Sequence, residues 1–202
     1  MTTLYQAPGA CSLAPMIALH AAGLPHDNVR VDLKAHRTAD GGDYYTVNPK
    51  GGVPALKLDS GDVLTENAVI LQYVADLAPQ SGLIPTSGIE RYHQLELLNY
   101  IATEVHKGFS PLFNPALPAE ARSLFIDMLG KKFGFLAQKL ADGGFIAGPT
   151  FTAADAYLFT VLRWTDPMKI DLSSWPALVA YRERVAAQPA VKAAVEEEGL
   201  GR

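Results

Sequence analysis

A single cysteine stands where a helix is expected to begin. Cys11 follows Pro8-Gly9-Ala10, and the pattern of apolar residues predicts a helix over residues 11–22. The unpaired N–H groups at a helix N-terminus carry positive partial charge, which stabilises a thiolate and lowers the pKa of a thiol. Cys11 is therefore a candidate reactive group, although a free cysteine also commonly serves as a small buried hydrophobe.

Two hydroxyl groups lie near this cysteine in the sequence. Ser12 is its neighbour, and Tyr5 belongs to a short strand expected over residues 3–6. Both hydroxyls can donate a hydrogen bond to a ligand or to the thiol. Tyr5 also fits plain strand packing, and the sequence leaves both interpretations open.

A proline enters a later strand at the Val53-Pro54 step. The expected strands over residues 53–58 and 62–64 flank Asp59-Ser60-Gly61, which is typical of a hairpin. Because proline lacks an N–H group, it fits the start of a strand, with its preceding peptide bond either cis or trans. A cis bond would turn the backbone groups of Val53 outward, where they could pair with a peptide-like ligand.

Glu66 and Asn67 lie at the start of a helix expected over residues 65–77. Backbone donors at a helix N-terminus bind carboxylates, and the Glu66 carboxylate can pair with an ammonium group. The pair would thus suit the two charged ends of an amino acid. Ordinary preferences for acidic and capping residues in a first helical turn explain the same residues without a ligand.

A line of polar residues marks the first helix of the second half, expected over residues 89–109. Asn99, Thr103 and His106 share one face at spacings i, i+4 and i+7. Such a line beside an apolar stripe fits one wall of a cleft, where a histidine can donate a proton or act as a general base. A solvated face is the alternative, and Lys107 fits a surface charge.

The two halves of the chain differ in their expected elements. The first half is expected to form a β-α-β unit followed by a β-β-α unit. The second strand of the β-α-β unit, over residues 28–33, is expected to lie parallel to the strand over residues 3–6. Residues 79–88 are rich in proline, glycine and serine, which indicates a linker. Thr152 and Asp155 have the spacing of a capping box. Further helices are expected over residues 119–141, 152–166, 175–187 and 189–197.

Composition excludes several classes of protein. The chain has 202 residues, 49% of them hydrophobic, and a net charge of -4, which argues against nucleic acid or an anionic membrane as partner. One cysteine allows neither an intramolecular disulfide nor a cysteine-based zinc cage, and no metal is expected. No signal peptide or membrane span is visible, so a cytoplasmic protein is expected.

Five motifs in order resemble the glutathione S-transferase family, specifically its bacterial beta class. They are APGACSLAP, DYYTVNPKGGVPAL, LTENAVILQYVAD, LNYIATEVHKGFSPLF and FTAADAYLFTVLRW. The resemblance implies an α/β plus all-α fold. Residues 1–80 would form a thioredoxin-like domain with a mixed four-stranded sheet, residues 81–88 a linker, and residues 89–202 an all-helical domain.

The resemblance also implies a site for glutathione. Pro54 would be cis, the Val53 backbone would pair with the cysteinyl part of glutathione, and Glu66 and Asn67 would hold its γ-glutamyl group. Cys11 and His106 would be catalytic. The implied glutathione-binding residues are Tyr5, Ser12, His36, Val53, Pro54, Glu66, Asn67, Asn99, Thr103, Glu104 and Lys107, with some contacts made across a homodimer.

Two positions depart from the family pattern. His36 stands where members often have lysine, and Gly52 stands where glutamine is common. Both changes bear on affinity for glutathione. An apolar pocket for the second substrate is expected near four residues, which are Phe109, Leu112, Phe113 and Trp164.

The expected function is conjugation of the glutathione thiolate to hydrophobic electrophiles, as in detoxification. One alternative is a glutathione-dependent thiol–disulfide oxidoreductase that works through a mixed disulfide at Cys11, since no second cysteine exists. Another is a non-catalytic ligand-binding or interaction protein on the same fold.

Overall fold

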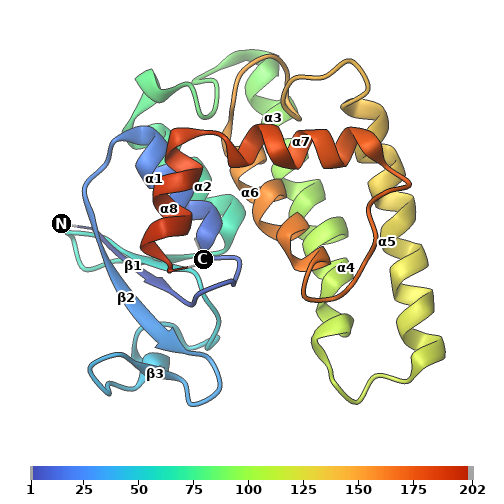
Figure 1. Ribbon diagram of the computed structural model, residues 1–202. Coiled ribbons are helices and arrows are strands. Elements are labelled where there is room, and N and C mark those ends of the chain that lie inside the picture. The colour runs from blue at the N-terminus through green and yellow to red at the C-terminus, as the bar shows by residue number, and fades with distance from the viewer. Residues whose placement is uncertain (1, 200–202) are drawn as a thin grey trace.

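A β-α-β unit opens the chain. β1 (Thr2–Gln6) pairs in parallel with β2 (His26–Asp32), and α1 (Leu13–Ala22) connects the two strands (Figure 1). Gly23 ends α1 in the left-handed conformation, with φ of 65°. The computed structural model describes residues 2–199 and confirms the parallel connection predicted from the sequence.

A β-β-α unit completes this half. β4 (Ala55–Lys57) and β5 (Val63–Thr65) form the predicted antiparallel hairpin, and α2 (Asn67–Leu77) follows. Among the described residues the sheet has five strands in the order β3-β2-β1-β4-β5, not the four predicted. The additional strand is β3 (Arg37–Thr38), which at two residues is too short to show the alternation that marks a strand.

Two helices begin later than the sequence predicted. α1 starts at Leu13, with Ser12 at its N-cap, so Cys11 lies in the turn before the helix. α2 starts at Asn67, because the preceding Glu66 has φ of 70° and ψ of 120°, outside the right-handed helical region. Thr65 consequently ends a strand instead of opening the helix.

The second half of the chain is helical in its described part, as predicted. Its long helices are α3 (Gly88–Tyr100), α5 (Ala119–Lys139), α6 (Ala153–Leu162), α7 (Pro176–Ala186) and α8 (Pro189–Glu197). The predicted helix over 89–109 is continuous, but its middle is a π-helical stretch, η3 (Ile101–His106), followed by α4 (Lys107–Phe109). Short 3-10 turns occur at η1 (Tyr44–Thr46), η2 (Pro79–Ser81), η4 (Ser110–Phe113) and η5 (Arg163–Thr165).

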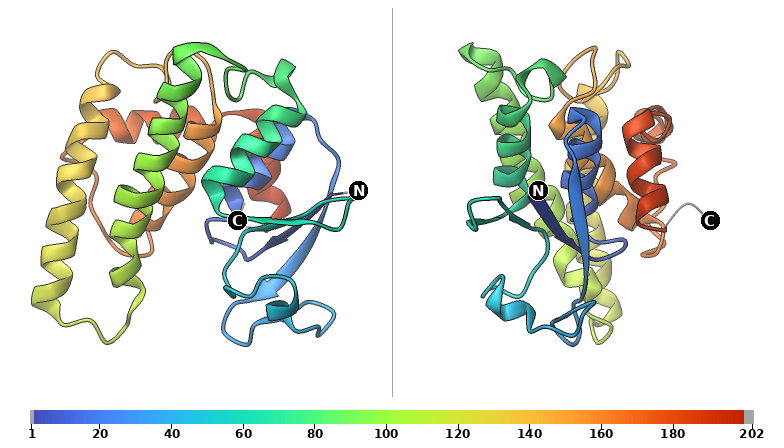
Figure 2. Two further views of the ribbon diagram at one scale, coloured as in Figure 1. Left: turned by 180° about the vertical axis from the view of Figure 1, so that it is seen from behind. Right: turned by 90° about the vertical axis from the view of Figure 1, so that its left-hand side faces the viewer.

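The last helix returns to the first half of the molecule. α8 packs against α1, and both lie on the same side as α2 above the sheet (Figures 1 and 2). One continuous cluster of buried apolar side chains extends from Leu4 in β1 to Ala194 in α8. The chain therefore passes from the first half to the helical half and returns with α8. The division into domains at residues 1–80 and 89–202, with a linker over 81–88, remains a prediction.

The predicted capping box begins α6. The Thr152 amide and hydroxyl both donate to Asp155, at 2.8 and 2.7 Å. Asp155 is fully buried and also accepts hydrogen bonds from the Ile146 amide and the Tyr181 hydroxyl. Its carboxylate thus joins three segments of the helical half, and burial raises its pKa.

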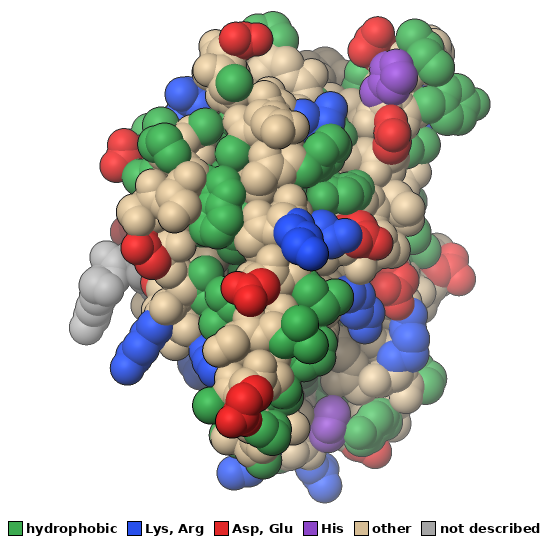
Figure 3. Space-filling view, turned by 90° about the vertical axis from the view of Figure 1, so that its right-hand side faces the viewer, with side chains coloured by type: hydrophobic (Ala, Val, Ile, Leu, Met, Phe, Trp, Pro, Cys, Tyr) green, Lys and Arg blue, Asp and Glu red, His purple; other side chains and the backbone are tan. Residues whose placement is uncertain are grey.

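The surface shows no concentration of one charge on the face over α5. Basic and acidic side chains alternate there with scattered hydrophobic ones (Figure 3). Within residues 2–199, no helix is long and apolar enough to cross a membrane.

Candidate active site

The loop between β1 and α1 presents Cys11 and is fixed at several points. Ser12 is fully buried, and its hydroxyl accepts from the Ala7 amide and donates to the Ala7 carbonyl, at 3.1 and 3.2 Å. The Trp164 indole donates to the Gly9 carbonyl at 2.8 Å, and Glu198 accepts from the Gly9 amide at 3.1 Å. Ser12 therefore holds the loop from inside, and its role as a glutathione contact remains a prediction.

The Val53-Pro54 step faces this loop. The peptide bond between the two residues is cis, in agreement with the family resemblance. The Cys11 thiol donates to the Val53 carbonyl, with 3.1 Å between Sγ and the oxygen. Tyr44 and Asn48 donate to the carbonyl of Gly52, which precedes Val53, and so fix the approach to this step.

The environment of Cys11 raises its pKa to about 11, mainly because the sulfur is buried. A hydrogen bond from Asn67 acts in the opposite direction, and the negative charge of Glu66 adds to the rise. The sequence predicted a lowered pKa from the helix N-terminus. That direction is wrong, because loss of hydration outweighs the hydrogen bonds from Asn67 and from the Cys11 backbone N–H, which lower the pKa.

Glu66 separates β5 from α2, and Asn67 is the first residue of α2. The Glu66 backbone has positive φ, a conformation that costs free energy in a non-glycine residue and is found preferentially at ligand sites. Its exposed carboxylate contacts the Lys50 ammonium at 2.5 Å. Asn67 is 5% exposed, and its Oδ1 has no hydrogen-bond partner among the described residues. An unpaired buried acceptor beside the thiol favours a ligand that donates to it.

His106 faces this group from the helical half. The π-helical stretch carries it, and π-helical turns often occur at functional sites. Its Nδ1 lies 2.6 Å from the Tyr157 hydroxyl of α6, and its ring contacts Trp164 edge to face at 4.9 Å between centroids. Burial, and next the positive charge of Lys107, lower the pKa of His106 to about 4.

These pKa directions define which atoms carry protons near neutral pH. Burial raises the pKa of Tyr157, so its hydroxyl stays protonated beside the neutral His106 ring. The 2.6 Å contact fits two arrangements: the hydroxyl donates to Nδ1 and the ring proton is on Nε2, or Nδ1–H donates to the hydroxyl oxygen. Cys11, His106 and Tyr157 are therefore all uncharged near neutral pH. Their thiol, imidazole N–H and hydroxyl groups can stabilise a bound anion by donating hydrogen bonds to it.

A cavity of about 360 Å³ is lined by residues of both halves of the chain. It brings together eight of the residues predicted from the sequence, which are Cys11, Val53, Pro54, Glu66, Asn67, Thr103, His106 and Lys107. Its other lining residues are Asn48, Lys50, Gly52, Thr65, Ala102 and Tyr157.

Sequence reasoning assigned no role to Asn48, Lys50 or Tyr157. All three lie inside motifs that carry the family resemblance. Asn48 donates to the nearby Gly52 carbonyl, whereas Tyr157 contacts His106 across 51 residues. No spacing rule predicts such a pair.

Two predicted residues of the first half lie away from the cavity. Tyr5 is in the sheet, with its ring 5.7 Å from that of Tyr44. His36 stacks on Tyr45 at 4.5 Å between centroids, with φ of 51° and a buried, unpartnered Nδ1. Neither lines the cavity in this chain, and their roles remain predictions.

Asn99 and Glu104, predicted in the helical half, also lie outside the cavity. Asn99 is exposed and its carbonyl accepts from the Thr103 hydroxyl at 3.0 Å. Glu104 forms an ion pair with Lys132 and lines a neighbouring hollow of about 230 Å³, together with Thr103 and other residues of α4 and α5.

Three of the four residues expected to bind the second substrate, Phe109, Phe113 and Trp164, form an aromatic group next to His106. Phe109 and Phe113 both contact Trp164 edge to face, at 5.6 and 5.2 Å between centroids. Phe109, Leu112 and Trp164 are 0%, 5% and 5% exposed, whereas Phe113 is 54% exposed. Of the four, only Phe113 presents most of its surface to a ligand.

The fold and this geometry define a class of protein. A thioredoxin-like unit with a cysteine opposite a cis-proline is joined to a helical unit that closes the cavity with a histidine and a tyrosine. The family description "Glutathione S-transferase, N-terminal domain" matches residues 1–76, and "Glutathione S-transferase, C-terminal domain" matches residues 100–189. The chain belongs to the glutathione S-transferase family.

Individual relatives agree over the whole length. The chain is 48% identical to glutathione S-transferase GstA of Escherichia coli O157:H7, over 98% of both chains. It matches a sphingomonad glutathione S-transferase complexed with glutathione and a bacterial beta class enzyme of Sphingomonas chungbukensis. Both structures have a TM-score of 0.94 and 45% identity over 98% of this chain and 99% of theirs. The predicted family, beta class and fold are confirmed.

Proposed function

We propose that this glutathione transferase joins the thiolate of glutathione to hydrophobic electrophiles in the 360 Å³ cavity. The proposal rests on one observation. A single cavity is lined by residues that are far apart in sequence, namely Cys11, Val53, Pro54, Glu66, Asn67 and His106. In the reaction the glutathione sulfur forms a bond to the electrophilic carbon. The leaving group departs with the bonding electrons, and the thiol proton passes to solvent.

The tripeptide would lie along the first half of the cavity. The Val53 backbone would pair with its cysteinyl part, and Glu66, Asn67 and the start of α2 would hold its γ-glutamyl group. The positive φ of Glu66 and the unpartnered Asn67 oxygen support this position. Thr103 and Lys107 line the opposite wall, where a cationic side chain suits an anionic peptide.

Cys11 and His106 would act as hydrogen-bond donors to the glutathione sulfur. The Cys11 proton would turn from the Val53 carbonyl to that sulfur once the Val53 backbone pairs with glutathione. With a pKa of about 11, Cys11 stays protonated near neutral pH. In this proposal the Tyr157 hydroxyl donates to Nδ1 of the neutral His106 ring, which then offers its Nε2–H to the sulfur. Donors aimed at developing negative charge in a water-poor site favour the thiolate over the thiol, which is the reactive form needed.

The remaining residues act less directly in this proposal. Ser12 fixes the Cys11 loop, while Tyr5 in the central strand β1 and His36 before β3 lie outside the cavity. The electrophile would meet Phe113, with Trp164, Phe109 and Leu112 packed behind. The competing thiol–disulfide reaction through a mixed disulfide at Cys11 is not favoured, because a raised pKa leaves little Cys11 thiolate.

A homodimer and a cytoplasmic role in detoxification complete the proposal. Asn99, Thr103 and Glu104 would then contribute to glutathione binding near a partner subunit. Ile89 and Tyr92 on α3 are 63% and 67% exposed, which is unusual for large apolar side chains and supports a subunit contact there.

The test is spectrophotometric conjugation of glutathione to an aryl halide. We expect turnover above background, and a loss of about 10- to 100-fold in kcat/KM for His106→Leu, because one charge-stabilising donor is removed. His93→Gln changes an exposed histidine on α3 and should retain activity. Absence of turnover with several electrophiles would contradict conjugation, and retained activity in His106→Leu would contradict the donor role.

A further inference from the structure

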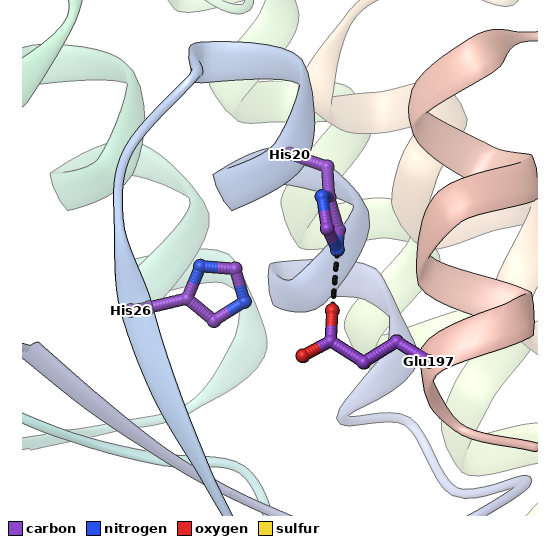
Figure 4. A group of neighbouring side chains, drawn as sticks. All are labelled: His20, His26 and Glu197. Carbon is purple, nitrogen blue, oxygen red and sulfur yellow. Dashed lines mark hydrogen bonds and ion pairs between the residues drawn. The ribbon is translucent and has the colours of Figure 1, made fainter.

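A group of metal-ligating side chains lies on the far side of α1 from the active site. His20 comes from the last turn of α1, His26 from the first residue of β2, and Glu197 from the end of α8. One potential ligand atom from each lies within 4.8 Å of the others. Figure 4 shows the three side chains converging from three separate elements.

His26 has the hydrogen bonding expected of a metal ligand. Its Nδ1 lies 3.0 Å from the Leu24 carbonyl, which can only accept, so the ring proton is on Nδ1. The lone pair is then on Nε2, which is buried and has no partner among residues 2–199. Histidine ligands typically donate their other ring nitrogen to a carbonyl in this way, whereas a buried nitrogen left without a partner is costly.

His20 and Glu197 complete the donor set. His20 Nε2 lies 2.6 Å from Glu197 Oε2, so in the metal-free chain Nε2 carries a proton that it donates to the carboxylate. An ion bound through Nε2 replaces this proton, which moves to Nδ1 or to solvent. The two rings of His20 and His26 meet edge to face at 5.3 Å between centroids. Asn28 donates to the other carboxylate oxygen of Glu197 at 2.5 Å and so orients it. Both partners of the His20–Glu197 contact remain partly exposed, at 27% and 39% of their side chains, which leaves a route for an ion.

We propose that His20, His26 and Glu197 bind a divalent first-row transition metal ion of the zinc type. Two imidazole nitrogens and one carboxylate oxygen are a common protein donor set for zinc, with water in the fourth position. Tetrahedral ligands at about 2.0–2.2 Å from the ion are roughly 3.4 Å apart, so movements of about 1 Å at the side-chain ends close the site. The sequence expectation of no metal considered only a cysteine-based cage.

Such an ion would tie three elements together. Glu197 ends α8, which packs on α1, while His26 begins β2. Because the ligands are assembled only in the folded chain, an ion bound here stabilises the folded state and raises the unfolding temperature. The proposal is independent of glutathione conjugation.

The first experiment titrates the metal-free full chain with Zn²⁺ alone and follows heat and unfolding temperature. We expect one equivalent to bind and to raise the unfolding temperature, and a chelator to reverse both. Mg²⁺ prefers all-oxygen ligands and should have no such effect. Co²⁺ should give the visible absorption of a tetrahedral site with nitrogen ligands.

Variants locate the ion. His26→Gln and His20→Gln should each weaken Zn²⁺ binding by more than about 100-fold, and Asn28→Ala by about 10- to 100-fold, since it orients a ligand. Circular dichroism without metal verifies that each variant folds. The matched control is His93→Gln. His93 also lies close to a glutamate, with 3.6 Å between its Nδ1 and Oε2 of Glu96, but it is outside the proposed site.

Cys11→Ser removes the one competing thiol and should leave Zn²⁺ binding unchanged. The proposal is overturned if no equivalent binds, if binding follows Cys11 or His93, or if folded His20→Gln and His26→Gln variants bind as the parent does.

Discussion

At the scale of single residues, burial decides how Cys11 behaves. The Cys11 sulfur donates to the Val53 carbonyl and lies in surroundings that penalise the thiolate, so its pKa is about 11. A free cysteine titrates near 8.5. The thiol therefore stays protonated at the pH at which an exposed cysteine begins to react.

This predicts slow and steeply pH-dependent alkylation of Cys11. Its rate with iodoacetamide should rise about tenfold per pH unit from pH 7 to 10 and show no plateau below pH 10, because only the thiolate reacts. Mass spectrometry of the single modified cysteine measures the rate. Glutathione alkylated in a separate solution is the control, and its rate should level off at about pH 9 to 10. A Cys11 plateau at or below pH 8 would show that the thiol is activated instead.

At the scale of elements, one carboxylate organises the start of α6. Asp155 accepts from the Thr152 amide and hydroxyl, the Ile146 amide and the Tyr181 hydroxyl, all at 2.7–2.9 Å. Removing it would leave several buried donors without a partner, each of which costs free energy. The capping box thus also anchors α7 and the loop before α6.

We expect Asp155→Ala to lower the free energy of unfolding by about 3–5 kcal/mol. Urea denaturation followed by circular dichroism measures the loss. Asp171→Ala is the matched control, since Asp171 also accepts two hydrogen bonds, from Ser173, but lies on an exposed loop. That change should cost less than about 1 kcal/mol. Equal losses in the two variants would mean that burial of Asp155 is not what makes it important.

At the scale of the whole molecule, the two halves share one apolar interior. The continuous buried cluster includes residues of β1, α1 and α2 as well as α3, α6 and α8. α8 lies on α1, and the Trp164 indole holds the loop that carries Cys11. Separating the halves would expose this shared surface, which favours cooperative unfolding.

Probes in the two halves should therefore report the same transition. Trp164 and Trp175 are the only tryptophans and both lie in the helical half, whereas Cys11 lies in the other. Guanidinium unfolding followed by tryptophan fluorescence and by Cys11 labelling should give midpoints within about 0.2 M of each other. Labelling of Cys11 at clearly lower denaturant would show that the first half unfolds separately.

The sequence by itself determined most of the elements. Their positions were predicted to within a few residues from three signals, which are the glycines and prolines, the helical and strand periodicity of apolar residues, and the Thr152–Asp155 spacing. These signals could be recognised because they act between residues that are near neighbours in sequence. Val53-Pro54 and Glu66-Asn67 were recognisable for the same reason. The two-residue strand β3 and the π-helical stretch were not, since neither leaves a periodic signal.

Only the tertiary structure decided how the site behaves. It placed Tyr157 against His106, gave Cys11 a raised pKa instead of a lowered one, and left Tyr5 and His36 outside the cavity. It also brought His20, His26 and Glu197 together across 177 residues. Hydration and electrostatic environment depend on which distant segments pack around a group, and no local pattern in a sequence encodes that packing.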